Sequence, residues 1–238
     1  MTHPRRHSPL LAAALAMALL LGAGCEPTCP NPDKGVGFYL ANYHDLACLD
    51  RVVFVELLPG PASFQEARDM TDALHQAIGQ RQLFHQRLLY RTDPACEDLP
   101  LDAQRVLVLE DLGALRKALD CDAVLLGSIR QIAPPPRMKL GLDLRLVDLR
   151  NGRMLWAVDH IWDTTHEPTV DRIEDWFDCT LRETYEPADA NMVLMGPSFF
   201  RKFVADEVAA TLRDPAVPLP EPTDRKSTRL NSSHRIRS

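Results

Sequence analysis

The residues best placed to do chemistry are two histidines and two aspartates close together in the chain: Asp159, His160, Asp163 and His166. An imidazole beside a carboxylate can exchange a proton near neutral pH, and the same groups can bind a metal ion. Chemistry of this kind needs burial or pairing that shifts the pKa, which solvated side chains at a strand end lack. The sequence favours the interpretation that these four side chains are solvated at the end of a strand. An exported enzyme or metal-binding protein that uses the His160 and His166 region is the alternative.

No catalytic signature supports that alternative. The sequence contains no Gly-x-Ser-x-Gly, no Walker loop, no Gly-x-Gly-x-x-Gly and no His-Glu-x-x-His. It has six cysteines: Cys25, Cys29, Cys48, Cys96, Cys121 and Cys179. None forms a Cys-x-x-Cys pair, so the zinc signal is weak, and the spacing does not fix disulfide pairing. We expect no catalytic residue, no cofactor and no metal. One or two disulfides together with a free thiol are compatible with the sequence, which leaves their pairing open.

Residues 1–24 have the layout of an export signal. They combine a basic start, a short apolar run and small residues, at Arg5–Arg6, Leu10–Leu21 and Gly22–Gly24. Cys25 follows directly, and the stretch resembles the lipobox of bacterial lipoproteins. The resemblance implies that the Cys25 thiol carries a lipid that holds the protein on a membrane; cleavage by the general signal peptidase is the alternative. The same resemblance implies that Glu26, in place of Asp, favours the outer membrane facing the periplasm.

The last residues, 224–238, resemble the translation of a sequencing-library adapter, and we exclude them from the fold. Their first eleven residues read DRKSTRLNSSH. A genuine basic tail that binds anionic lipid or nucleic acid is the alternative. The chain has a net charge of −6; this becomes −10 without the tail, which carries five Lys or Arg and one Asp, and −12 once Arg5 and Arg6 are also removed. So acidic a protein is not expected to bind nucleic acid.

The stretch 122–163 predicts three strands of one sheet. Leucines at every second position from Leu140 to Leu146 alternate with Gly141, Asp143, Arg145 and Val147. This is the pattern of a strand with one buried face. Asp143 and Arg145 are expected to form a surface pair worth little to stability.

The neighbouring strands are expected at 123–132 and 153–162. Asn151 and Gly152 tolerate positive φ and favour a hairpin turn before the third strand. On that strand we expect Met154, Trp156 and Val158 to share one side, with Trp156 in the core.

The other segments predict strands at 51–58 and 83–90 and helices at 63–79, 109–119, 170–185 and 198–212. Ser63 with Glu66 forms a capping box, and Ser198 is expected to cap the last helix. The order strand, helix, strand, helix, strand, strand, strand, helix predicts a mixed α/β (α+β) fold with one mixed sheet of about five strands covered by helices.

The expected organisation has five parts. They are the signal 1–24, a tether 25–50 with a short ordered piece at Tyr39–Leu49, the domain 51–213, a Pro-rich tail 214–223 and the adapter-like 224–238.

The run ALDCDAVLLGSI and the later GLDLRLVDLRNGRMLWAV resemble exported lipoproteins of the CsgG, PelC, LpoB and TolB N-terminal group. The residues that match its recurring pattern are Asp122, Val124, Gly127, Leu144, Leu146, Asp148, Gly152 and Trp156. The resemblance covers roughly 51–163 and implies an anticodon-binding-domain-like fold. Cys121 departs from the pattern, since a small residue is usual there.

The resemblance also implies a role in envelope assembly, secretion or synthase activation that needs no catalytic residue. We therefore expect a lipid-anchored, non-enzymatic envelope protein that binds another envelope protein as an assembly, scaffold or regulatory component. The other expected partner is a second copy of the same chain, in a homo-oligomer.

Overall fold

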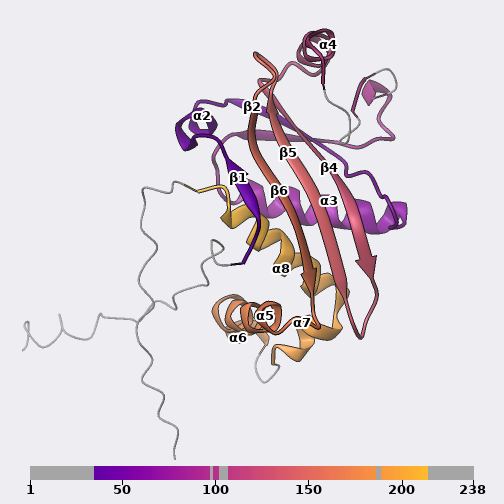
Figure 1. The fold of residues 1–238 in the computed structure, drawn as a ribbon, viewed down its shortest axis with the longest axis vertical. Helices are drawn as coiled ribbons and strands as arrows, with labels where there is room; N and C mark the ends of the chain where they lie inside the picture. The colour runs from indigo at the N-terminus through magenta and orange to yellow at the C-terminus, as the bar shows by residue number, and fades with distance from the viewer. Residues whose placement is uncertain (1–34, 97–98, 102–106, 186–188, 214–238) are drawn as a thin grey trace, which may run out of the picture. The chain divides into compact units, whose positions relative to one another are not determined.

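The computed structural model describes residues 35–96, 99–101, 107–185 and 189–213. Within them lies one six-stranded sheet in the order β1-β6-β5-β4-β2-β3, seen face-on in Figure 1. Its strands are β1 (Phe38–Leu40), β2 (Arg51–Val55), β3 (His85–Leu89), β4 (Ala123–Ala133), β5 (Lys139–Asp148) and β6 (Met154–Asp163). β2 runs parallel to β3 and β4, whereas β4, β5, β6 and β1 pair antiparallel. The sheet is therefore mixed and open, as the order of the elements predicts.

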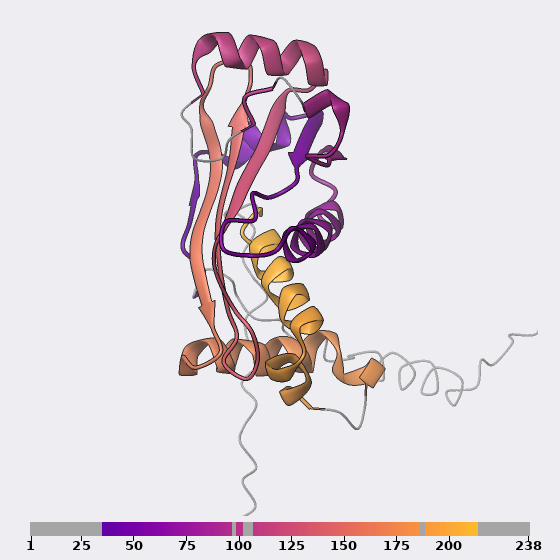
Figure 2. The ribbon, with the colours of Figure 1, turned by 90° about the vertical axis from the view of Figure 1, so that its right-hand side faces the viewer.

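One face of the sheet is covered by helices (Figure 2). They are α3 (Phe64–Gly79) and α8 (Pro197–Ala210), while α5 (Glu167–Thr180) lies across one end of the sheet (Figure 2). The alternating leucines of β5 point at them: Leu142, Leu144 and Leu146 are fully buried. The same core holds Trp156, Phe177 and Phe203. A fully buried side chain of this size contributes about 1.5–3 kcal/mol, so this face holds most of the core.

The opposite face is covered only at one end among the described residues. There α4 (Leu109–Leu119) lies across the start of β4 (Figure 1). Leu112, Leu115 and Leu119 pack on Val53 and Val124 in a second, smaller core. The rest of this face, over β4, β5 and β6, carries no described helix.

The remaining helices are short. They are α2 (Tyr43–Ala47), α6 (Arg182–Tyr185) and α7 (Asn191–Met195). The ordered piece expected at Tyr39–Leu49 corresponds to most of β1 and to α2, with Leu46 and Leu49 buried in the main core. None of the described helices has the length and apolar character needed to cross a bilayer.

The expected fold class is confirmed, with six described strands rather than about five, because β1 adds a short edge strand to β6. The helices at 63–79 and 109–119 and the capping box of Ser63 with Glu66 also match. The prediction that Ser198 caps the last helix was wrong, because Gly196 is the N-cap and Pro197 begins the helix. Pro suits this first position because its missing N–H would have no helical partner there.

Met154 was also placed wrongly. The register between β5 and β6 shifts next to Leu146 and Val147, and such an irregularity changes which side chains share a face. Met154 is consequently exposed while Trp156 and Val158 are buried.

Candidate functional site

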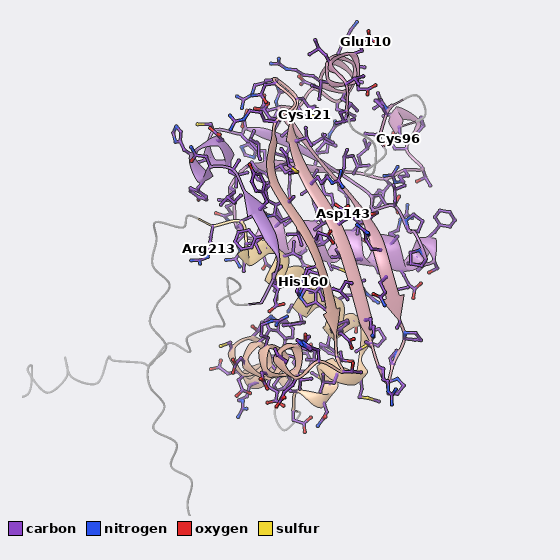
Figure 3. All side chains as sticks on the ribbon, in the orientation of Figure 1. Cys96, Glu110, Cys121, Asp143, His160 and Arg213 are labelled. Carbon is purple, nitrogen blue, oxygen red and sulfur yellow. The ribbon has the colours of Figure 1, made fainter. Side chains whose placement is uncertain are left out.

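The uncovered part of the sheet carries a compact group of polar and half-exposed side chains. We call it the open face, and it consists of Tyr39, Arg130, Asp143, Arg145, Asp159 and Ile161. Strand pairing places these residues together, because Asp143 lies opposite Asp159, Arg145 opposite Ala157, and Ala157 opposite Tyr39. Tyr39 and Ile161 are about half exposed, at 49% and 50%. Asp143 marks its centre in Figure 3.

Asp143 is the electrostatic centre of the open face. Arg145 donates to it twice, from Nε at 3.1 Å and from a terminal nitrogen at 3.0 Å. Arg130 lies 3.7 Å from Asp143 and 3.8 Å from Asp159. The two arginines leave the Asp143 side chain only 9% exposed. The pair is thus bidentate and partly shielded, a stronger arrangement than the exposed pair expected from sequence.

The histidine and aspartate side chains near position 160 do not converge on one site. Side chains alternate along β6, so His160 lies on the covered face and Asp159 on the open face. The His160 ring meets Trp162 edge-on at 4.7 Å, and its Nδ1 accepts from the Gly37 N–H at 3.4 Å. Burial lowers the pKa of His160, and the Arg172 guanidinium lowers it further. The ring is therefore held neutral near pH 7.

The other two members of that group have separate roles. Asp163 pairs with Lys139 at 2.6 Å; burial acts to raise the pKa of Asp163, but hydrogen bonds from Lys139 and Thr165 outweigh it and lower the pKa to about 2. His166 is the exposed N-cap of α5. Across the part of the chain that the structure describes, no group of three or more His, Cys, Asp or Glu is placed to hold a metal. The structure therefore does not bring Asp159, His160, Asp163 and His166 together at one site.

A buried ionic network lies near His160, and the sequence reasoning missed it. Glu207 of α8 accepts from Trp162 Nε1 at 2.6 Å and from Arg172 Nε at 2.8 Å. Burial raises the pKa of Glu207, and Arg172 and Trp162 oppose this. The signal was available, since Glu207 falls at helical spacing from the buried Phe203 and Val204.

The other two tryptophans also bind α8 or the residue that follows it. Trp176 Nε1 donates to Asp206 at 3.0 Å, and Trp156 Nε1 donates to Thr211 at 2.9 Å. Buried indole N–H groups usually find such acceptors. These bonds position β6 and α5 against α8, and they serve the fold rather than a reaction.

Two pockets among the described residues could be considered as ligand sites. An apolar one of about 90 Å³ lies between the end of the β4–β5 hairpin and the starts of α3 and α8, which is small beside the roughly 300 Å³ of a typical ligand site. A wider one of about 680 Å³ is lined by Arg91, Cys96 and Ser128 among others. Its described lining includes no histidine or carboxylate to act as a base for Cys96. Burial also raises the pKa of that thiol.

The cysteines divide between described and undescribed parts of the chain. Cys25, the expected lipid-attachment residue, and Cys29 lie outside the described residues. Cys48, Cys96 and Cys121 are free thiols. No disulfide therefore joins any two of these three described cysteines.

No protein family and no curated protein matches the sequence. Among solved structures, the chain is similar to the PelC dodecamer from Paraburkholderia phytofirmans, with 12% identity, a TM-score of 0.44, and coverage of 75% of this chain and 98% of that one. It is also similar to lipoprotein GNA1162 from Neisseria meningitidis, with 17% identity, a TM-score of 0.36, and coverage of 50% and 86%.

LpoB from E. coli is a third similar structure, with 14% identity, a TM-score of 0.35, and coverage of 69% of this chain and 77% of that one. PelC and LpoB belong to the group that the sequence resembles. These three TM-scores are all below 0.5.

Proposed function

We propose that this chain is an exported envelope protein, anchored by a lipid on Cys25 and exposed to the periplasm at the outer membrane. The basic start, the short apolar run and the small residues before Cys25 support export and lipidation. An acidic chain gains little from electrostatic attraction to anionic membranes, so a covalent lipid would supply the attachment. Labelling cells with a palmitate analogue tests this: label on the protein, lost in Cys25→Ala, is expected, and an unlabelled protein contradicts it.

The folded domain acts as a non-enzymatic assembly, scaffold or regulatory component that binds another envelope protein. The open face is the observation that carries this role. It combines half-exposed Tyr39 and Ile161 with a fixed arrangement of two arginines and two aspartates. Aromatic and Arg side chains are enriched where proteins bind one another. Arg145 is already oriented by Asp143, so binding would cost little side-chain entropy there.

A photoreactive amino acid placed at Ile161 in cells tests the open face directly. We expect one discrete cross-linked product at Ile161 and none at Phe64, an exposed hydrophobic residue that begins α3. Sizing of the purified protein separates a different partner from a second copy of the chain. No product at Ile161, or the same product at Phe64, would contradict the role of this face.

A charge reversal gives a second measurement on the same face. Arg130→Glu places a carboxylate next to Asp143 and Asp159, and we expect the Ile161 cross-link to weaken at least about threefold. Arg116→Glu, on the exposed side of α4, is the matched control and should leave it unchanged. Equal effects of the two variants would mean that overall charge, and not the open face, governs binding.

A further inference from the structure

A cysteine and a histidine are paired on the exposed side of α2. His44 and Cys48 are four residues apart, one helical turn, so their side chains lie on the same side. Cys48 Sγ is 3.7 Å from His44 Nε2. Cys48 is exposed to solvent. A base in contact with an accessible thiol is the arrangement that activates a cysteine nucleophile.

The turn between β5 and β6 lies next to α2. α2 is held near the turn by an ion pair of Asp45 with Arg153, at 3.4 Å. The pKa of Arg150 is raised, chiefly by its hydrogen bond to Asp148, and the negative form of Cys48 adds to that rise.

Cys96 and Cys121 lack these features. Cys121 is only 2% exposed, and burial raises its pKa and that of Cys96. Cys179 is half-buried in α5. The thiolate is the reacting form of cysteine, and selectivity among thiols follows exposure and thiolate character. Within the part of the chain that the structure describes, reaction is therefore expected first at Cys48.

We propose that Cys48, with His44 as its base, is a thiol–disulfide exchange site that reacts with small-molecule disulfides. The Cys48 proton passes to His44 Nε2, and the thiolate attacks one sulfur of the incoming disulfide. A Cys48–sulfur bond forms, the original S–S bond breaks, and the departing thiolate takes a proton from His44 or from solvent. The disulfide is the oxidant in this step and is reduced to one thiol. Exported proteins meet such disulfides in oxidising compartments.

Glutathione disulfide is the probe, used with the purified full-length protein at pH 7. Intact mass followed over time and peptide mapping measure how fast each thiol is modified. We expect the first adduct on Cys48, its loss in Cys48→Ser, and a rate at least about threefold lower in His44→Gln. His85→Gln, which alters an exposed histidine on β3, is the matched control and should keep the original rate.

Three results would overturn the proposal. The first adduct could form on a cysteine other than Cys48. His44→Gln could react as fast as the unaltered protein while circular dichroism shows the same fold. The isolated protein could already hold Cys48 in a disulfide with another of its cysteines. All of these are read on purified protein, so they are independent of whether the open face binds a partner.

Discussion

Replacing Glu207 by Gln tests whether the buried network holds β6 and α5 to α8. Gln can still accept from Trp162, but Arg172 loses its counter-charge. The Arg172 and Glu207 side chains are only 13% and 7% exposed, and removing one member of a buried pair costs about 3–5 kcal/mol. Arg172 keeps a hydrogen bond to the Pro168 carbonyl at 3.2 Å. We therefore expect Glu207→Gln to lower the free energy of unfolding by about 3 kcal/mol.

A double variant separates the ionic interaction from packing. Burial raises the pKa of Glu207 despite Arg172 and Trp162, which indicates that the ionised pair gains little beyond its own desolvation. Removing both charges is then much less costly than removing one. We expect Arg172→Met with Glu207→Gln to be only about 1 kcal/mol less stable than the unaltered protein.

Urea unfolding at pH 7, followed by tryptophan fluorescence and circular dichroism, measures these differences. Glu174→Gln, an exposed carboxylate on α5, is the control and should change stability by less than about 0.5 kcal/mol. A loss below about 1 kcal/mol for Glu207→Gln, or a double variant equal to the sum of the single ones, would refute the reasoning.

Two further predictions concern local geometry and pH. Gly60 has φ +55°, and a Cβ there would collide with the Ile129 carbonyl oxygen, so Gly60→Ala should lower the free energy of unfolding by at least about 2 kcal/mol. A Cβ at Gly113 in α4 meets open space, so Gly113→Ala should instead stabilise the protein by about 1 kcal/mol. Equal shifts of the two variants in thermal melts would contradict these predictions. Burial acts to raise the pKa of Asp163, but hydrogen bonds from Lys139 and Thr165 together outweigh it and lower the pKa from 3.8 to about 2. A lowered carboxyl pKa gives stability that is present above pH 3.8 and lost as the pH falls through 2, so Lys139→Gln should lose about 1–2 kcal/mol at pH 5, after allowance for solvent screening, and much less at pH 2. Urea midpoints at the two pH values measure this, and a constant difference would contradict it.

The strands and the two longer early helices could be predicted because their patterns are local. Leu140 to Leu146 alternate with Gly141, Asp143 and Arg145, which fixes both the strand and its buried face. The capping box at Ser63 likewise sets the start of α3 within four residues of sequence. Such signals need no knowledge of distant contacts.

The features that sequence reasoning missed depend on partners far along the chain. β1 has only three residues, too few for periodicity, and it exists because β6 offers it an edge. The irregular register that exposes Met154 arises from pairing between β5 and β6. Glu207 reaches Trp162 across 45 positions. Its unusual place in an apolar stripe was visible, but its partners were not.

The candidate site was harder to predict for the same reason. His160 and Asp159 are adjacent in sequence yet lie on opposite faces of β6, so closeness along a strand separates side chains rather than joining them. Arg130, Asp143 and Asp159 come from three different strands and meet only because β4, β5 and β6 pair side by side.

The chemistry of the open face also sets the kind of binding it can support. Its centre is a shielded ionic arrangement, whereas the covered face presents leucine, tryptophan and phenylalanine to the helices. Exposed charges such as Arg130 act mainly on association rate and partner choice, and salt screens them. Half-exposed Tyr39 and Ile161 offer limited apolar area beside them. An interface built here would therefore be reversible and sensitive to salt. A permanent, largely apolar interface would need large apolar side chains, which in this sheet lie on the covered face and pack against the helices.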